Sequence, residues 1–548
     1  MKTGWFVVIV VISLLGVSFT SPGATAERGK RRSHPGQGHT LRGGTSSFPD
    51  YLDPQLSYTT EGWSAMYDTY IPLLTYRHAD GTAGAEVIPG LARSLPKITN
   101  GGTTYTLFLR KDLRYSTGRP VKASDFKFAV ERMFRLNSPG SSFYTDIVGA
   151  RKFQRTGLDG IAGITTNDRT GKITVHLLRP RGTFTNELGL LFVAPVPPGT
   201  PISNQTSNPP PATGPYAITT SDPGRGWDYA RNPEWRRNNA RLMPQLPTGR
   251  LARIDIAVVP NGTSLVQKVE RGELDWSLAS PPADRYGALK RKYEGTQFRV
   301  EPSLNTYFFW MNTRRPPFDN LKVRQAVNYA VDRSALQRIY AGQMAPSQQI
   351  LPPGMPGYIK LNLYPHNMVE AKRLIAEAKP ADRNITVWTD NERPNYEAGT
   401  YYRQVLQELG FSARVKKVSG YSYFTVIGNA SKPNLDTGWF DWFEDYPHPN
   451  DFFQPMLDGE SILPTYNTNF AQLDVPSLNE KIRQLDERPL GSQRENEYAV
   501  LDRSYMEQAP WVPFGNLTQS IFVSSAIDLD KVIWNPTFGA DLASFKFK

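Results

Sequence analysis

The chain has 548 residues, too long for one ordinary domain, and its length predicts about three to four domain-sized units. Its 39% hydrophobic and 21% charged residues are typical of a globular protein with large buried cores. Cysteine is absent, which excludes disulfides, thiol catalysis, cysteine-bound metal and a lipid-acceptor cysteine. The net charge of +12 would suit nucleic acid or acidic envelope polymers, but ordinary surface charge explains it equally well.

The N-terminus predicts export. Met1 and Lys2 give a short positive region, residues 5–15 are almost wholly apolar, and Ala24-Thr25-Ala26 has the small-x-small pattern of a cleavage site. We therefore predict a signal peptide over residues 1–26, with an uncleaved anchor as the alternative. Export argues against a nucleic-acid partner. Residues 27–45 are polar and glycine-rich and predict a flexible linker.

The first half of the chain alternates strand and helix patterns. Expected strands cover residues 104–110 and 173–178, the second of which would place His176 inside a sheet as a packed side chain. Between them Ser124 is expected to cap a helix. After a rigid proline-rich stretch over 195–215, residues 253–278 read as strand, helix and strand, which predicts a mostly parallel sheet.

The second half repeats this rhythm. We expect strands over 306–312, 385–389 and 413–418, and helices over 323–331, 334–342, 369–378 and 397–409, the last ended by Gly410. No tandem repeat is present. Two α/β units, each with its own sheet, are the simplest interpretation.

No familiar catalytic signature occurs in the chain. The patterns HExxH, GxSxG, GxxxxGK[ST] and GxGxxG are absent, and the six histidines never recur at helical ligand spacing. We expect no cofactor, no metal and no catalytic residues. A metal site at His448 with Asp441, Glu444, Asp445 and Asp451 is conceivable, but loop carboxylates more often contact water or cations. A hydrolase with two acids stays open, because their separation cannot be seen in a sequence.

One stretch, GWFDWFEDYPHPNDFF over residues 438–453, mixes carboxylates with aromatic rings. A hydrophobic core would exclude the acids, and a solvated loop would not need the rings. The mixture predicts a partly buried polar site.

Several separated segments resemble the family 5 (cluster C) solute-binding proteins of ABC transporters, which include oligopeptide-, dipeptide- and nickel-binding receptors. The longest are YTLFLRKDLRYSTGRPVKASDFKFAVERM (105–133), TGPYAITTSDPGRGWDYARNPEW (213–235) and MNTRRPPFDNLKVRQAVNYAVDR (311–333), joined by LDP (52–54) and QAPWVPF (508–514). The resemblance runs, with gaps, from about residue 46 to 540.

The resemblance implies an α/β fold of the periplasmic-binding-protein-like type II, with two lobes, an extra subdomain on the first lobe and a hinge of two crossovers. Lobe I would combine residues 46–60, 185–302 and 515–548. The extra subdomain would be residues 61–184, and lobe II residues 303–514. The crossovers would lie near 303–308 and 508–516.

The resemblance also implies a ligand site. In peptide-binding members an aspartate in a Trp-x-x-Asp-x-x-x-Pro segment holds the α-ammonium group of the ligand, and Asp445 takes its place here. Trp442, Phe443 and Tyr446 would provide apolar walls. A helix cap, or a partner for an arginine of the other lobe, is the alternative role for Asp445. Glu444 either points away or adds negative charge that favours dibasic ligands.

A second part of the implied site falls on Tyr58, Thr59 and Thr60, where the family has an extended segment that pairs with the peptide backbone. A solvent-exposed strand without that role is the alternative. The chain departs from oligopeptide binders at Gly140, where an aromatic residue would pack over the ligand, although Phe143 and Tyr144 are close by.

The implied function is an extracytoplasmic receptor, not an enzyme, that captures short peptides and delivers them to the permease subunits of an ABC importer. It would be a monomer in the periplasm or at the cell surface. The alternatives are a receptor for an oligosaccharide, an opine or a nickel chelate, a secreted hydrolase, and a basic wall- or nucleic-acid-binding protein.

Overall fold

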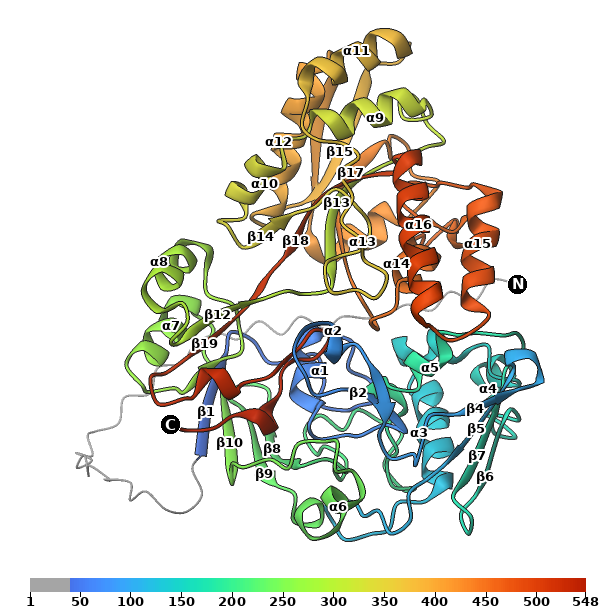
Figure 1. Cartoon of the computed structure of the whole chain (residues 1–548), viewed down its shortest axis with the longest axis vertical. Coiled ribbons are helices and arrows are strands. Elements are labelled where there is room, and N and C mark those ends of the chain that lie inside the picture. Colours follow the sequence, from blue (N-terminus) through green and yellow to red (C-terminus); the bar gives the residue numbers. More distant parts are fainter. Residues whose placement is uncertain (1–39) are drawn as a thin grey trace, which may run out of the picture. The chain divides into compact units, whose positions relative to one another are not determined.

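The computed structural model describes residues 40–548 (Figure 1). The predicted signal peptide over 1–26, and the predicted linker up to residue 39, lie outside the described residues. Three larger sheets organise the fold; the first takes its strands from three separate stretches of the chain, and the other two are each built from consecutive strands. No helix within residues 40–548 combines the length and the apolar character needed to cross a membrane.

The first sheet has seven strands in the order β12-β19-β11-β1-β10-β9-β8. Its strands are β1 (Thr40–Thr45), β8 (Tyr216–Asp222), β9 (Gly226–Arg231), β10 (Arg253–Val258), β11 (Trp276–Ser277), β12 (Phe298–Glu301) and β19 (Gln519–Val523). Only β1 pairs in parallel, with β10 on one side and β11 on the other. The predicted mostly parallel sheet is therefore wrong, because the hairpin β8-β9 and the returning strand β19 add antiparallel pairs.

The prediction of a flexible linker is wrong for residues 40–45, which form strand β1. The sequence TLRGGT looks flexible, yet it forms a central strand of the first sheet. A Cβ atom on Gly44 would lie 2.5 Å from Leu265 and 2.7 Å from Leu274. The glycines are thus required by close packing of helix α7 (Gly262–Glu270) against the strand, and not by flexibility.

The second sheet has six strands in the order β14-β18-β13-β17-β15-β16. They are β13 (Asn305–Met311), β14 (Met344–Pro346), β15 (Asn384–Asp390), β16 (Ser412–Val418), β17 (Thr437–Phe443) and β18 (Trp511–Leu517). Every residue of β13 is buried, which is expected of a strand covered on both faces. The surrounding helices include α9 (Leu321–Ala330), α10 (Arg333–Ile339), α11 (Met368–Ala378) and α12 (Asn395–Glu408), close to their predicted positions.

The third sheet is antiparallel, in the order β4-β5-β7-β6, and packs with helix α3. Its strands are β4 (Lys97–Thr99), β5 (Thr104–Phe108), β6 (Ile164–Asn167) and β7 (Lys172–His176). Helix α3 spans Ala123–Arg135, so the predicted cap at Ser124 is wrong. Asp125 instead accepts the backbone N–H of Lys122 at 3.0 Å and ties down the first turn. The imidazole of His176 contacts the hydroxyl of Thr104, as expected of a packed histidine.

Further α-helices and short strands surround these sheets. The helices are α1 (Thr60–Met66), α2 (Gly81–Gly84), α4 (Ala150–Thr156), α5 (Phe184–Glu187), α6 (Ala240–Leu242), α8 (Ala283–Tyr293), α13 (Gly420–Ile427), α14 (Asn450–Leu457), α15 (Pro476–Asp486) and α16 (Ser492–Gln508). The strands are β2 (Leu74–Tyr76), β3 (Val87–Pro89), β20 (Trp534–Asn535) and β21 (Gly539–Ala540). We keep the names lobe I and lobe II for the parts around the first and the second sheet; their boundaries stay predictions.

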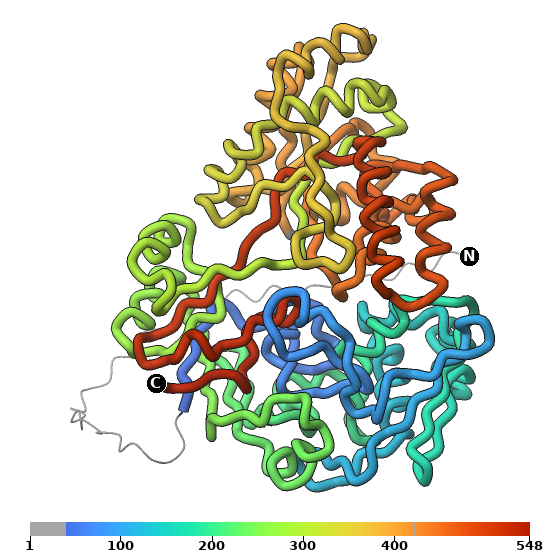
Figure 2. The backbone as a smooth tube through the Cα atoms, in the orientation of Figure 1, coloured from blue at the N-terminus to red at the C-terminus, as the bar shows by residue number. Residues whose placement is uncertain are grey.

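Two short segments connect the first and second sheets. Residues 302–304 join β12 to β13, and Thr518 alone joins β18 to β19, slightly later than the expected crossover over 508–516 (Figure 2). The side chain of Asn305 ties these segments together: its Oδ1 accepts the N–H of Leu517 at 2.7 Å, and its Nδ2 donates to the Leu517 carbonyl at 2.8 Å. The two crossings therefore form one connected hinge.

The LDP motif has a structural role. Asp53 binds Arg132 of helix α3 through both carboxylate oxygens, at 2.8 and 2.6 Å, and both side chains are fully buried. Arg132 also donates to Gln55, and Asp53 accepts the backbone N–H of Gln205. This pair fixes α3 to the segment that precedes α1.

We predict that Asp53→Asn lowers the free energy of unfolding by about 3–5 kcal/mol, because it leaves the buried guanidinium without its counter-charge. Chemical denaturation measures the loss. Asp159→Asn is the matched control, since Asp159 pairs with Lys152 on the surface and should change stability by less than about 1 kcal/mol. Equal stability of Asp53→Asn and wild type would contradict this role.

Candidate functional site

The segment with mixed rings and acids lies where the two lobes meet. Strand β17 ends at Phe443, and residues 444–449 lead from it into α14. Tyr446 in this segment packs into the hydrophobic core of lobe I and the extra subdomain, although its neighbours in sequence belong to lobe II. Its ring lies 6.1 Å from that of Phe143, centroid to centroid. The expectation of a partly buried polar site is therefore met by a segment that bridges the lobes.

Asp445 occupies the centre of this junction. Its side chain is half-buried, and the hydroxyl of Tyr58, from lobe I, donates a hydrogen bond to it. Its backbone N–H donates to Oδ2 of Asp451 at 2.8 Å. Burial raises the pKa of the Asp445 carboxyl to about 7, and the hydrogen bond from Tyr58 opposes that rise only partly.

Further carboxyls surround Asp445 without basic partners. Asp451 and Glu444 are buried, and burial raises the pKa of both. Asp441, farther back on β17, instead accepts a hydrogen bond from Tyr307, and burial raises its pKa to about 6. Within residues 40–548, no lysine, arginine or histidine forms an ion pair with any of these four acids. The junction therefore favours a positively charged group that comes from outside the chain.

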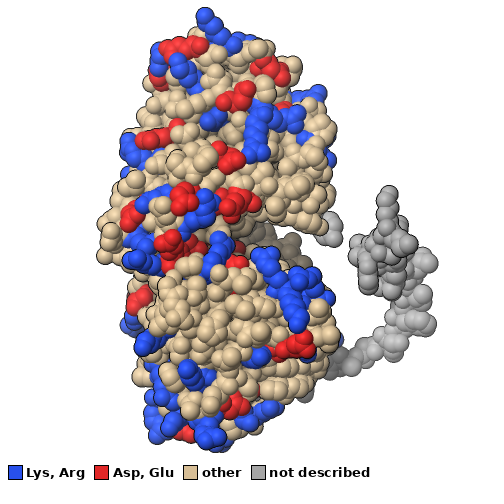
Figure 3. All heavy atoms as spheres, turned by 90° about the vertical axis from the view of Figure 1, so that its right-hand side faces the viewer, with Lys and Arg blue, Asp and Glu red and all other residues tan. Residues whose placement is uncertain are grey.

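A pocket of about 280 Å³ lies between the lobes. Its walls include Thr60, Glu61 and the C-terminal residues Trp534 and Phe538 from lobe I, and Phe443 from lobe II. No lysine or arginine of the described residues lines it. Figure 3 shows the molecule hollowed between its upper and lower parts, and lysine and arginine interspersed with acids on this face. The pocket offers apolar walls with an acidic edge.

Two of the predicted site residues line this pocket, Phe443 and Thr60. Asp445 lies beside it: Glu444, the preceding residue, contacts the hydroxyl of Thr537 in the pocket wall. Trp442 donates its indole N–H to Asp451 at 3.4 Å and packs on the core of lobe II. The indole of Trp442 thus contacts Asp451, which in turn binds the backbone N–H of Asp445.

Thr59 keeps the expected extended backbone, but Thr60 does not. Thr59 caps helix α1, because its hydroxyl accepts the N–H of Gly62 at 3.2 Å and donates to Asp50 at 2.9 Å. Thr60 is the first residue of α1, so the prediction of an extended edge is wrong at that position. A threonine followed by helix-forming residues is a capping signal, and here it ends the extended conformation.

The departure at Gly140 has a steric cause. A Cβ atom there would lie 2.4 Å from the ring of Phe192, so the backbone is too close for any side chain. Phe143 instead places its ring 6.4 Å from that of Tyr58, while Tyr144 is buried and bonded to the carbonyl of Glu187 at 2.6 Å. Of the two nearby rings, Phe143 is the one at the junction.

The conceivable metal site at His448 is not formed. The imidazole is fully buried, and its Nδ1 accepts the N–H of Asn450 at 3.1 Å. Burial lowers the pKa of His448 to about 3. The ring faces Tyr498 rather than the acids of the 441–451 segment. His448 is a packed core histidine.

A second junction joins the extra subdomain to lobe II. The backbone N–H of Gly182 donates to the carbonyl of Asp486, and that of Thr183 donates to its carboxylate at 3.0 Å. A Cβ atom on Gly182 would lie 1.9 Å from the carbonyl oxygen of Arg488. The buried Arg181 lies 3.9 Å from the Asp486 carboxylate and also pairs with Glu187. This junction requires glycine at position 182.

The sequence did not identify the role of Asp451 or the pocket wall formed by Trp534, Thr537 and Phe538. The C-terminal wall meets residues near position 60, more than 450 positions away, and no local pattern encodes that contact. For Asp451, the only available signal was its place in the ring-and-acid stretch.

Comparison with known proteins agrees with this architecture. The family described as bacterial extracellular solute-binding proteins, family 5 Middle, matches residues 86–462. The chain is 25% identical over 454 residues to the probable di/tripeptide-binding protein 5 of Pseudomonas aeruginosa, covering 79% of this chain and 82% of that one. It is 26% identical over 459 residues to heme-binding protein A of Haemophilus influenzae, covering 78% of each chain. The solved structure of clavulanic acid biosynthesis oligopeptide binding protein 2 has a TM-score of 0.83 at 24% identity, covering 93% and 95% of the two chains.

The raised pKa of Asp445 predicts how stability depends on pH. Between about pH 4 and 7 the folded chain holds a proton that the unfolded carboxyl, with a pKa of 3.8, has lost, so the free energy of unfolding falls as pH rises through this window. Asp445→Asn should therefore stabilise the ligand-free protein at pH 8, by about 1–2 kcal/mol once solvent screening of this half-buried group is allowed for.

Denaturant titrations of wild type and variant at pH 5 and pH 8 measure this effect. The two proteins should differ less at pH 5 than at pH 8. Part of the pH dependence should remain in the variant, because Glu444 and Asp451 also have raised pKa values. A variant less stable than wild type at pH 8 would show that Asp445 stabilises the fold and is not held at its expense.

Proposed function

Because the chain belongs to family 5 of the bacterial extracellular solute-binding proteins, we propose that it captures short peptides between its lobes and delivers them to the permease of an ABC importer. The observation that carries this proposal is Asp445, an acid at the lobe junction whose hydrogen-bonding side-chain partner is a neutral tyrosine. The names of the Pseudomonas relative and of the structurally similar oligopeptide-binding protein agree with a peptide ligand.

The α-ammonium group of a peptide suits this position. An unpaired carboxylate among rings is unfavourable, and a cation that loses its water in a closing cleft is equally so. Pairing the two groups forms a charge-assisted hydrogen bond, which is stronger than a neutral one. Tyr58 approaches Asp445 from lobe I, so a bound ammonium would be held where both lobes contribute. Asp445 thus supplies the anchor, and Phe443 and Thr60 supply walls of the adjacent pocket.

Other solutes fit less well. The relative from Haemophilus is named for heme, but the pocket is lined by no histidine, methionine or tyrosine of the described residues, and these are the usual iron ligands. An oligosaccharide, an opine or a nickel chelate would not form the same ammonium–carboxylate pairing with the acids around Asp445, which have no basic partner among the described residues. A hydrolase that pairs serine with histidine is disfavoured by the same lack of histidine. We therefore expect binding without catalysis.

The proposed setting is outside the cytoplasm. The signal-peptide pattern over residues 1–26 and the extracellular family both agree with export. We expect the protein in the periplasm or at the cell surface, without a lipid-acceptor cysteine. The expected partners are a small peptide and the membrane permease. We expect a monomer and no nucleic-acid binding, in keeping with the mixed charges in Figure 3.

Asp445→Ala should weaken the binding of short peptides by about 2–5 kcal/mol without preventing folding, because it removes the counter-charge of the ammonium group. Isothermal calorimetry with a panel of di- and tripeptides measures this loss. Asp222→Ala is the matched control, since Asp222 is an exposed acid on β8. Wild-type affinity in Asp445→Ala would remove the proposed anchor.

The same panel tests the chemistry of the anchor. N-acetylated peptides should bind far less well than their free counterparts, because acetylation removes the charge. Affinity should fall about tenfold per pH unit below pH 7, where Asp445 becomes protonated. A peptide with a second ammonium group should bind better than a neutral one, because a nearby cation favours the ionised form of Glu444 and Asp451, whose pKa values burial raises. Equal binding of free and acetylated peptides would indicate a different solute.

Binding should also change the arrangement of the lobes. Two lobes joined by two short crossings can rotate about them, and a ligand that gains contacts with both lobes only on closure shifts the population towards the closed form. The junction of Gly182 and Thr183 with Asp486 would form on closure, far along the chain from the hinge.

Gly182→Ala should hinder closure, because its new methyl group would collide with the Arg488 carbonyl. We expect saturating peptide to reduce the radius of gyration of the wild type, as measured by small-angle scattering, and to change that of Gly182→Ala much less. Gly491→Ala is the matched control, since no atom lies within 4 Å of a Cβ at that position. Identical wild-type profiles with and without a bound peptide would indicate a rigid pocket.

A further inference from the structure

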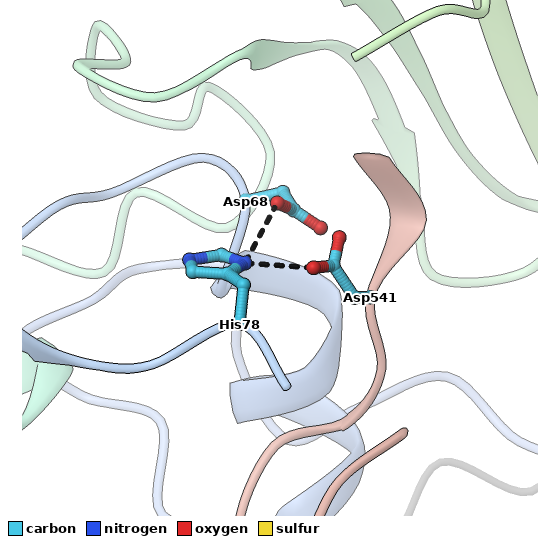
Figure 4. Close-up of side chains that lie close together, drawn as sticks. All are labelled: Asp68, His78 and Asp541. Carbon is cyan, nitrogen blue, oxygen red and sulfur yellow. Dashed lines mark hydrogen bonds and ion pairs between the residues drawn. The ribbon is translucent and has the colours of Figure 1, made fainter. Parts of the chain in front are cut away.

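Three buried side chains from distant parts of the chain converge in lobe I (Figure 4). Asp68 follows helix α1, His78 follows strand β2, and Asp541 follows strand β21. Nδ1 of His78 lies 2.7 Å from Oδ2 of Asp541 and 3.9 Å from Oδ1 of Asp68. At most 3% of any of these side chains is exposed. This group is separate from the acids around Asp445.

The two carboxylates are held so that one oxygen of each faces the imidazole. The backbone N–H of Ala543 donates to Oδ2 of Asp68 at 3.2 Å and to Oδ1 of Asp541 at 2.8 Å. The other oxygens, Oδ1 of Asp68 and Oδ2 of Asp541, point at Nδ1 of His78. Backbone donors that orient ligating carboxylates in this way are a regular feature of metal sites.

Oδ1 of Asp68 has no hydrogen-bond partner within residues 40–548. Asp68 is 1% exposed, and the 3.9 Å between this oxygen and His78 is too long for a hydrogen bond. A buried carboxylate oxygen without a partner is costly. It is aimed at the space between the three side chains, where a cation would satisfy it.

The chemistry of the three groups limits the occupant. The three donor atoms lie within 4.8 Å of one another. Metal–ligand distances of about 2.0–2.2 Å place neighbouring ligands roughly 3–4 Å apart, so the site needs only small shifts, chiefly a longer separation between His78 and Asp541. An imidazole together with two carboxylates suits a first-row divalent ion such as Zn²⁺ better than Ca²⁺ or Mg²⁺, which prefer oxygen ligands alone.

We propose that Asp68, His78 and Asp541 bind one divalent transition-metal ion of the Zn²⁺ class. The ion would neutralise two buried carboxylates that have no lysine or arginine partner among residues 40–548. Its role is structural, because it joins the segment after α1 to the C-terminal segment whose residues Trp534 and Phe538 line the interlobe pocket. The proposal does not depend on which solute the protein captures.

The metal content of the untagged protein, purified without chelator, tests the proposal. We expect about one equivalent of transition metal per chain by mass spectrometry, slow loss to EDTA because the site is buried, and a higher melting temperature of the loaded form. Titration of the metal-free protein with Co²⁺ should give the visible absorption of a coordinated ion at one equivalent, and Zn²⁺ should displace it.

His78→Gln and, as the conservative second variant, Asp68→Asn should each lower metal occupancy at least tenfold and abolish the Co²⁺ spectrum. His176→Gln is the matched control, because that histidine contacts only Thr104 among polar side chains and should leave occupancy unchanged. Absence of stoichiometric metal and of a Co²⁺ spectrum from the folded wild type would overturn the proposal. Unchanged metal binding in His78→Gln would overturn it as well.

Discussion

The hydrogen bonds of Asn305 hold the two crossings between the lobes together. One amide side chain satisfies both the N–H and the carbonyl of Leu517, and Asn516 returns a hydrogen bond to the Asn305 carbonyl at 2.7 Å. The crossings therefore act as a single narrow hinge and not as two independent tethers. Every feature between the lobes, including the pocket, the Asp445 junction and the Asp486 junction, depends on the axis that this hinge defines.

The acids at the lobe junction illustrate a conflict between stability and binding. A core optimised for stability would not keep Glu444, Asp445 and Asp451 together among rings, because each carboxyl is destabilised by burial. Their raised pKa values reflect the free-energy cost of burying the charged form of each carboxyl. The same arrangement would make the site responsive to an external cation, since folding has already supplied the energy needed to remove water from these carboxyls.

Much of the fold could be predicted from the sequence because its signals are local. Strand β13 and helices α9 to α12 follow from hydrophobic period and glycine stops, and the family motifs gave the two-lobed class. What failed depended on distant contacts. Gly44 looks like part of a linker in the sequence, but Leu265 packs against it; the first sheet is not mostly parallel, because the strand that returns from residue 519 pairs antiparallel with β11 and β12.

The candidate site likewise combines features that have a local sequence signal with features that depend on distant contacts. One ungapped motif singled out Asp445, which lies at a lobe junction beside Tyr58; its role as a ligand anchor stays a prediction. The local conformation of Thr60 could not, because the cap at Thr59 competes with the extended segment known from relatives. The convergence of Asp68, His78 and Asp541 spans more than 450 positions, and no spacing rule for metal ligands covers such a distance.

The C-terminal wall of the interlobe pocket has a consequence for how the protein matures. Residues 534–539 come more than 450 positions after Thr60, yet they line the same pocket as Thr45 and Thr60. The central strand β1 likewise pairs only with strands that come more than 200 residues later. A chain synthesised or translocated only as far as residue 533 therefore lacks one wall of the pocket, which is complete only once residues 534–539 have folded back against Thr45 and Thr60.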